Sequence, residues 1–212
     1  MGRTKILLAD DHTLLLEAFK RLLEPEFEVV GTVADGRALL TAAQKLKPDV
    51  IVLDISMPLL SGLEAARQLQ GVSPHPKLIF LTMNPDPDVA QEALRLGASG
   101  YLLKTSAASE LTKAIRAALR GLKYITPRMK RKLEEAYIED PSGEKRPHVL
   151  SSRQHEVLQL LVEGRPMKEV ASILNIAART VAYHKYKMME DLRVKSTAEL
   201  IQYALKNKIV PS

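Results

Sequence analysis

The chain of 212 residues contains no cysteine and no tryptophan, and aromatic residues make up only 4% of it. The absence of cysteine excludes a disulfide framework and a cysteine-ligated metal site, and it fits a reducing cytosol. No apolar run approaches the ~20 residues that a membrane-spanning helix needs. The first residues lead directly into an apolar segment, and no secretory signal fits there. We therefore expect a cytoplasmic protein with aliphatic cores and no membrane partner.

The whole chain has a net charge of +6. The excess of positive charge is concentrated in its last third. Residues 1–122 hold 14 basic and 14 acidic side chains, residues 123–148 hold 7 and 5, and residues 149–212 hold 10 and 6. A neutral N-terminal part and a basic C-terminal part indicate that the C-terminal part binds a polyanion.

Five short apolar segments in residues 1–122 have the pattern of buried β-strands, and each gap between them is long enough for a helix. The expected strands are Ile6–Ala9, Phe27–Ala34, Val50–Leu53, Leu78–Leu81 and Tyr101–Leu103. The second alternates in polarity, as edge strands do, and the third is apolar on both faces, as central parallel strands are. Strands that alternate with helices predict an open parallel α/β sheet.

Four of these strands are followed by side chains that can bind or react, namely Asp10 and Asp11, Asp54, Thr82 and Lys104. Because an open parallel sheet binds its ligands beyond the carboxyl ends of its strands, these residues should meet in one pocket. Asp10, Asp11 and Asp54 are suited to Mg²⁺, and the Asp54 carboxylate can act as a nucleophile that forms an aspartyl phosphate. Lys104 and Thr82 would contact the phosphoryl oxygens. A single aspartate at a strand end is most often a helix cap or a turn residue, and a single threonine or lysine there usually has no function, so the combination carries the hypothesis.

Residues 1–122 resemble a bacterial response-regulator receiver domain along their whole length. The residues that carry the resemblance are Asp10-Asp11, Asp54 followed by Met57-Pro58 and Gly62, Thr82, and Lys104. It implies a flavodoxin-like five-stranded parallel sheet, and phosphorylation of Asp54 by a sensor histidine kinase with Mg²⁺. It also implies that Thr82 and an aromatic residue move together as a switch. Tyr101 fills the aromatic position, although it could instead be a half-buried residue of an edge strand.

Residues 123–148 show no clean strand pattern and are expected to form a linker. Within them, Arg128–Tyr137 could form a charged helix, and Asp140–Pro147 has the composition of a flexible connector. From Leu150 onward the pattern is helical throughout. A short helix, a tight turn and a longer helix within a basic four-helix unit predict a helix-turn-helix.

Residues 149–212 resemble the four-helix DNA-binding domain of the family that includes nitrate-response and quorum-sensing regulators. The residues that carry this resemblance are Leu150-Ser151, Arg153, Glu156-Val157-Leu158, Gly164, Lys168-Glu169-Val170-Ala171, Leu174, Thr180-Val181, His184 and Leu192. The segment departs from the family at Pro166 and at Ala177-Ala178, where polar residues usually cap the second and third helices. Loss of a side-chain cap costs about 1 kcal/mol, so the third helix should fray or be capped by a DNA phosphate.

The third helix of this unit, Ala178–Leu192, is expected to read DNA. Its apolar residues Val181, Met188 and Leu192 should pack inward. The DNA contacts are expected from Arg179, Thr180, Ala182, Tyr183, His184, Lys185, Tyr186 and Lys187. The basic residues and the threonine would meet phosphates, whereas the alanine and the two tyrosines would reach base edges with modest specificity. The histidine could equally bond within the domain.

The last helix, Ala198–Lys206, presents Leu200, Ile201, Ala204 and Leu205 as a candidate homodimer seam. These residues could also pack onto the helix-turn-helix, or do both. Two copies of the chain would read half-sites about one helical turn apart.

These features predict a transcription regulator switched by phosphorylation, with a receiver domain (1–122), a linker (123–148) and a DNA-binding domain (149–212). Its expected partners are a sensor histidine kinase, double-stranded DNA and, when phosphorylated, a second copy of the chain. No enzymatic activity is expected beyond self-directed phosphoryl transfer and slow autodephosphorylation.

Two functions of other classes remain as alternatives. An aspartyl-phosphate phosphatase usually carries a second aspartate two residues after the nucleophile, where this chain has Ser56. The second alternative is a DNA-binding protein that does not depend on phosphorylation and uses its receiver only to bind partners. The complete set of pocket residues argues against this alternative.

Overall fold

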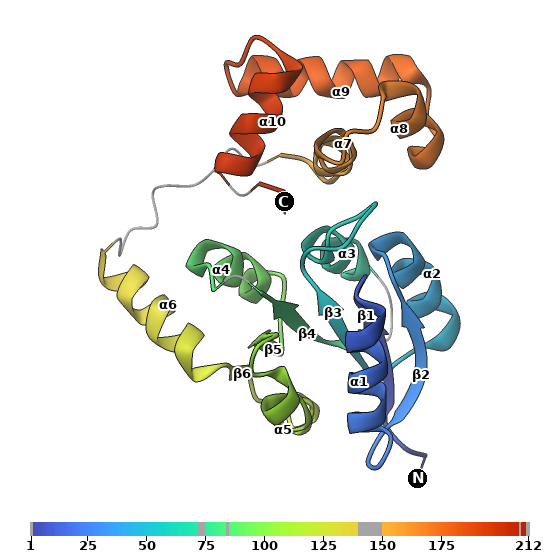
Figure 1. Ribbon diagram of the computed structural model, residues 1–212, viewed down its shortest axis with the longest axis vertical. Coiled ribbons are helices and arrows are strands. Elements are labelled where there is room, and N and C mark those ends of the chain that lie inside the picture. The colour runs from blue at the N-terminus through green and yellow to red at the C-terminus, as the bar shows by residue number, and fades with distance from the viewer. Residues whose placement is uncertain (1, 72–74, 84, 140–149, 208, 211–212) are drawn as a thin grey trace.

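A parallel sheet flanked by helices and a separate group of four helices make up the computed structural model (Figure 1). The structure describes residues 2–71, 75–83, 85–139, 150–207 and 209–210. Among these, no helix is both long enough and apolar enough to span a bilayer.

Six parallel strands form the sheet, in the order β2-β1-β3-β4-β5-β6. They are β1 Lys5–Ala9, β2 Glu28–Val33, β3 Val50–Asp54, β4 Lys77–Thr82, β5 Gly100–Leu103 and β6 Tyr124–Ile125. The predicted parallel α/β fold is confirmed, with β2 at an edge and every residue of β3 buried. The sixth strand was not predicted, because two residues show no periodicity.

Helices cover both faces of the sheet, which explains why its inner strands are apolar on both sides. One face packs against α1 Thr13–Leu23 and α5 Ala107–Leu119. The other face packs against α2 Gly36–Leu46, α3 Gly62–Leu69 and α4 Pro87–Arg95.

The segment after α5 packs against the sheet and its helices. Helix α6 Pro127–Glu139 follows β6 and packs on α4. Its Met129 is fully buried in the same apolar cluster as Tyr101. The Thr126 hydroxyl accepts from the Leu103 N–H at 3.3 Å and donates to Glu110 Oε2 at 2.7 Å. The connector expected at 140–147 lies outside the described residues.

The four remaining helices pack around one aliphatic core. They are α7 Ser152–Val162, α8 Met167–Leu174, α9 Ala178–Asp191 and α10 Thr197–Lys206. The predicted helix-turn-helix is formed by α8 and α9. Pro166 and Ala177, which precede these two helices, give no side-chain cap. Helix α7, by contrast, begins with a capping box formed by Ser151 and Gln154.

The turn after β3 has no room for a side chain at Gly62. A Cβ there would lie 2.0 Å from the Asp54 carbonyl oxygen, and the Gly62 N–H donates to the Ile55 carbonyl oxygen at 2.9 Å. We expect Gly62→Ala to lower the free energy of unfolding by about 1–3 kcal/mol in urea denaturation, because the overpacked turn must shift. Gly71→Ala is the control, since a Cβ at Gly71 meets nothing within 4 Å. Equal destabilisation by the two variants would contradict this account.

Candidate functional site

The predicted pocket residues lie together at the carboxyl ends of β1, β3, β4 and β5. Asp10, Asp54 and Thr82 are 1%, 2% and 5% exposed, respectively. The Lys104 ammonium lies 2.7 Å from Asp10 Oδ2 and 2.9 Å from Asp54 Oδ2. Asp11 stands at the mouth of the pocket with 38% of its side chain exposed. The buried Lys104 ammonium therefore links two carboxylates at the carboxyl ends of β1 and β3.

The pKa values in the pocket reflect a competition between burial and pairing. Burial raises the pKa of Asp54, the Lys104 ammonium and the Ser56 N–H oppose the rise, and the Asp10 carboxylate adds to it. Burial alone would lower the pKa of Lys104, but its contacts with Asp10 and Asp54 outweigh burial and raise it. Further positive charge beside the two buried aspartates is therefore favourable.

The carboxylates gathered here could hold a metal ion. Ligand atoms of Asp10, Asp11, His12 and Asp54 all lie within 4.8 Å of one another. The His12 Nδ1 is 3.0 Å from Asp10 Oδ1 and 2.8 Å from Asp11 Oδ1. His12 was not predicted, although its place directly after the two aspartates was a signal in the sequence. Three carboxylates are the donor set of a hard divalent cation, so the residues present fit such an ion.

Tyr101 lies in the interior, next to the strand that ends at Thr82. It is 0% exposed, and so it is not the half-buried edge residue considered as an alternative. The edge of β5 is covered by β6, and Met129 belongs to the same apolar cluster as the tyrosine. Burial raises the pKa of Tyr101, the Asp86 carboxylate adds to the rise, and an interaction with Thr82 opposes it. Thr82 therefore lies close enough to the Tyr101 hydroxyl to influence its pKa.

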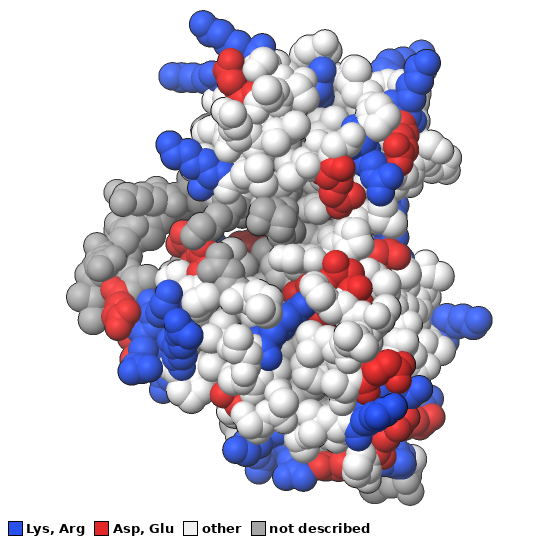
Figure 2. All heavy atoms as spheres, viewed as in Figure 1, with Lys and Arg blue, Asp and Glu red and all other residues white. Residues whose placement is uncertain are grey.

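Helix α9 lies on the side of the helical unit that faces away from the sheet (Figure 1). Tyr183 and Tyr186 are 64% and 59% exposed, and Arg179 is also exposed. Val181 and Met188 are fully buried, as their spacing predicted. Figure 2 shows lysine and arginine side chains projecting from this unit at the upper margin of the view. The exposed face of α9 therefore combines aromatic and basic groups.

Other expected DNA-contacting residues of α9 have partners within the unit. Lys185 is only 8% exposed, and its Nζ lies 4.4 Å from the ring centroid of Tyr186. Lys187 forms ion pairs with Glu190 and Asp191, each at 3.1 Å. The His184 ring packs edge-on against Tyr183, and partial burial together with the charge of Arg153 lowers the pKa of His184. Thr180 and Ala182 are half-buried.

The candidate dimer seam on α10 is smaller than expected. Leu200 and Ala204 are 0% exposed and belong to the core of the helical unit. They cannot form an exposed seam, because their helical spacing turns them toward α7 and α9. Ile201 is half-buried and Leu205 is 38% exposed, so only these two remain at the surface.

Replacing Lys104 with Met should leave Asp10 and Asp54 facing each other without a cation. We expect the free energy of unfolding at neutral pH to fall by about 3 kcal/mol, because a buried ion pair loses one partner. Millimolar divalent cation should restore part of the loss. Urea denaturation with and without the cation measures both effects, and Lys77→Met, at an exposed position of β4, is the control. If the urea midpoint of the Lys104 variant equals that of the wild type, Lys104 does not stabilise the two buried carboxylates.

Two family models match the chain. Residues 6–116 match the response regulator receiver domain, and residues 148–204 match the bacterial regulatory proteins of the luxR family. Oxygen regulatory protein NreC of Staphylococcus carnosus (strain TM300) is 36% identical over 214 residues, which cover 97% of this chain and 99% of NreC.

The chain is also similar to solved structures of RcsB. RcsB from Salmonella enterica serovar Typhimurium, bound to promoter P1flhDC with the phosphomimetic BeF3-, is 29% identical. That match has a TM-score of 0.63 and covers 97% of this chain and 100% of that one. A structure of two RcsB dimers bound to two parallel DNAs is 31% identical, with a TM-score of 0.60, and the match covers 95% of this chain and 98% of that one. The chain thus belongs to the response-regulator family, and it is a DNA-binding response regulator with a receiver domain and a luxR-type helix-turn-helix domain.

Proposed function

We propose that a sensor histidine kinase phosphorylates Asp54 and that this modification raises the affinity of the chain for duplex DNA. The observation that carries the proposal is the Lys104 ammonium, which lies between the buried Asp10 and Asp54 carboxylates. The receiver (1–122) would be the input domain, and residues 149–212 the output domain, acting in the cytoplasm. Promoter binding by RcsB in the presence of a phosphomimetic supports this division of roles.

The Asp54 carboxylate is the proposed nucleophile. One of its oxygens bonds to phosphorus as the bond from phosphorus to the kinase histidine nitrogen breaks, and the imidazole leaves with that electron pair. Asp10, Asp11 and Asp54 would hold Mg²⁺, which supplies charge that neutralises the carboxylates and the phosphoryl oxygens. Lys104, already 2.9 Å from Asp54 Oδ2, is placed to bind the new phosphoryl oxygens.

Thr82 and Tyr101 would then transmit the change through the receiver. The Thr82 hydroxyl can turn about χ1 toward the phosphoryl oxygens, which alters its interaction with the buried Tyr101. Because Met129 packs in the same cluster as Tyr101, the rearrangement reaches α6 as well as α4. The phosphoryl group acts by biasing the receiver between two packed arrangements.

Helix α9 is the proposed DNA reader. Arg179 and Thr180 would bind phosphates near its uncapped start, and Tyr183 and Tyr186 would contact base edges in the major groove. Two copies of the chain would place their α9 helices on half-sites about one helical turn apart. The structure of RcsB dimers on DNA supports a dimer as the binding form.

Beryllium fluoride with Mg²⁺, as a phosphoryl mimic, should tighten binding to duplex DNA. We expect an increase of roughly 5- to 150-fold, the usual range of allosteric coupling. Fluorescence anisotropy at fixed salt measures it. Asp54→Ala should bind DNA at the resting affinity with or without the mimic. Identical wild-type binding in both states would leave a phosphorylation-independent DNA binder.

Arg179→Ala should weaken the affinity for DNA by about the same factor whatever the DNA sequence, because a phosphate contact does not depend on sequence. If Arg179 contacts one phosphate, the slope of log affinity against log salt should become shallower by about 1. Lys113→Ala, at an exposed position of α5 in the receiver, is the control and should keep the slope. A sequence-dependent loss with an unchanged slope would instead place Arg179 on a base edge.

A further inference from the structure

The shortest strand of the sheet, β6, runs along the outer edge of β5 (Figure 1). Ile125 lies opposite Tyr101, and the Thr126 N–H donates to the Tyr101 carbonyl oxygen at 3.0 Å. Pro127 then begins α6. The match to the receiver family model ends at residue 116, before β6 and α6 begin. Two elements from outside the matched region therefore cover the outer edge of β5.

The Thr126 side chain supplies an acceptor that this short strand lacks. If β6 continued, the Thr126 carbonyl oxygen would accept from the Leu103 N–H, because alternate N–H groups of a parallel strand donate to the same neighbour. That carbonyl instead accepts from the Met129 and Lys130 N–H groups at 2.8 and 3.0 Å, in the first turn of α6. The Leu103 N–H donates to Thr126 Oγ1 at 3.3 Å. A buried N–H without an acceptor is costly, so the hydroxyl is needed where the backbone turns away.

Glu110 of α5 sets the direction of that hydroxyl. Thr126 Oγ1 donates its one hydrogen to Glu110 Oε2 at 2.7 Å, which leaves its lone pairs for the Leu103 N–H. The same carboxylate acts on Tyr124 of β6: burial raises the pKa of Tyr124, and the charge of Glu110 adds to the rise. Thr126 itself is only 3% exposed. One buried hydroxyl thus joins β5, β6 and α5.

Lys104 directly follows Leu103, and its own N–H is held from the opposite side of β5. The Lys104 N–H donates to the Thr82 carbonyl oxygen at 2.8 Å. Two successive N–H groups at the end of β5 are therefore anchored to different neighbours, one to β4 and one to the residue after β6. From this backbone the Lys104 ammonium reaches Asp10 and Asp54 at 2.7 and 2.9 Å. Anchoring on both sides fixes the point from which the ammonium extends, and loss of one anchor lets that point move.

Helix α6 also holds the segment that follows β4. Lys132 Nζ donates to the Pro85 carbonyl oxygen at 3.2 Å, in the loop that leads from Thr82 to α4. Met129, in the first turn of α6, is fully buried in the same apolar cluster as Tyr101. The start of α6 is thus tied both to the end of β5 and to the loop after β4.

We propose that Thr126 is a positioning residue of the phosphoryl-accepting site, whose hydroxyl holds the end of β5 so that the Lys104 ammonium meets the oxygens of a phosphoryl group on Asp54. This inference rests on the proposed function and extends that site beyond the part of the chain that matches the receiver family. Thr126 acts through the backbone of Leu103 and Lys104, whereas the ammonium itself contacts the reacting group. The hydroxyl, rather than the bulk of the side chain, is the feature that positions the site.

Thr126→Val and Thr126→Ser separate the hydroxyl from the shape of the side chain. Valine keeps the shape and leaves the Leu103 N–H without its acceptor, whereas serine keeps the hydroxyl. The whole protein is mixed with Mg²⁺ and a saturating acyl phosphate, and intact mass follows the initial rate at which Asp54 is phosphorylated. We expect Thr126→Val to lower this rate by roughly 2- to 10-fold, the effect of one lost hydrogen bond, and Thr126→Ser to restore most of it. Thr41→Val makes the same change at an exposed position of α2 and should keep the wild-type rate.

Combination with Lys104→Met distinguishes a positioning role from a general loss of stability. If Thr126 acts through Lys104, Thr126→Val lowers the rate in the wild-type background but has little further effect once the ammonium is gone. A loss by the same factor in both backgrounds would overturn the positioning role. Glu110→Ala removes the acceptor that orients the hydroxyl and should lower the rate in the same direction, so the test does not depend on Thr126→Val folding.

The outcomes separate this inference from the proposed function. If the wild type is phosphorylated on Asp54 and the folded Thr126→Val, or Glu110→Ala in its place, reacts at the wild-type rate, Thr126 does not position the site and the proposed function stands. If Thr126→Ser is as slow as Thr126→Val, the hydroxyl is not responsible and the inference is wrong in the same way. If the wild type is not phosphorylated on Asp54, the proposed function fails and the inference fails with it.

Discussion

One ammonium between two buried carboxylates is the interaction on which the rest of this molecule depends. Lys104 comes from the end of β5, and its partners Asp10 and Asp54 come from the ends of β1 and β3. Two carboxylates this buried would repel each other without it. In the proposed phosphorylation, a phosphoryl group on Asp54 would offer the ammonium stronger partners than the aspartate it holds at rest.

Two sets of contacts connect the surroundings of that pocket with more distant parts of the molecule. One runs through Thr82 and the buried Tyr101 to Met129, so that α6 is in contact with the expected switch. The other runs through the loop after β3 to Leu59 and helix α7. The first lies within the receiver, whereas the second depends on how this chain packs its DNA-binding unit.

The sheet and its pocket could be predicted from the sequence because a parallel topology makes distant strand ends neighbours. The two-residue β6 could not, since it has no periodicity. Lys185 was expected at DNA phosphates for its charge, yet it follows Val181 by four residues and precedes Met188 by three, on the buried flank of α9. Leu200 and Ala204 show the same ambiguity, because an apolar stripe fits a core as well as a dimer seam.

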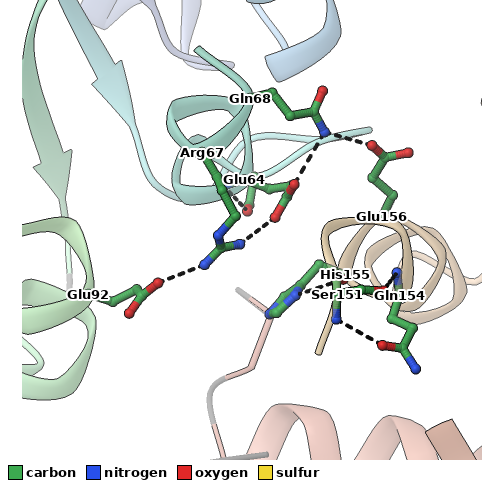
Figure 3. A network of polar contacts seen from close by, with 9 residues as sticks. Glu64, Arg67, Gln68, Glu92, Ser151, Gln154, His155 and Glu156 are labelled. Carbon is green, nitrogen blue, oxygen red and sulfur yellow. Dashed lines mark hydrogen bonds and ion pairs between the residues drawn. The ribbon is translucent and has the colours of Figure 1, made fainter. Parts of the chain in front are cut away.

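The domain junction lay beyond prediction for a different reason. The DNA-binding unit contacts the receiver there through α7, whose Glu156 accepts from Arg37 of α2 at 3.2 Å and from Gln68 of α3 at 2.7 Å (Figure 3). Arg37 and Glu156 are 119 residues apart, and neither carries a local signal that it has a partner. Glu156 was noted only as part of the family resemblance, although a glutamate beside the apolar Val157 and Leu158 indicates a carboxylate that needs donors from elsewhere. Contacts between two units with separate cores follow from surface complementarity, which a periodic pattern does not encode.

The most direct test follows phosphorylation and DNA affinity in the same sample. The protein is loaded with an acyl phosphate and Mg²⁺, freed of donor, and sampled over time for intact mass and for DNA binding. The account predicts a single phosphoryl group, absent from Asp54→Ala, and a DNA affinity that falls in step with its hydrolysis. Full phosphorylation of Asp54 with DNA affinity equal to that of the unmodified protein would contradict it.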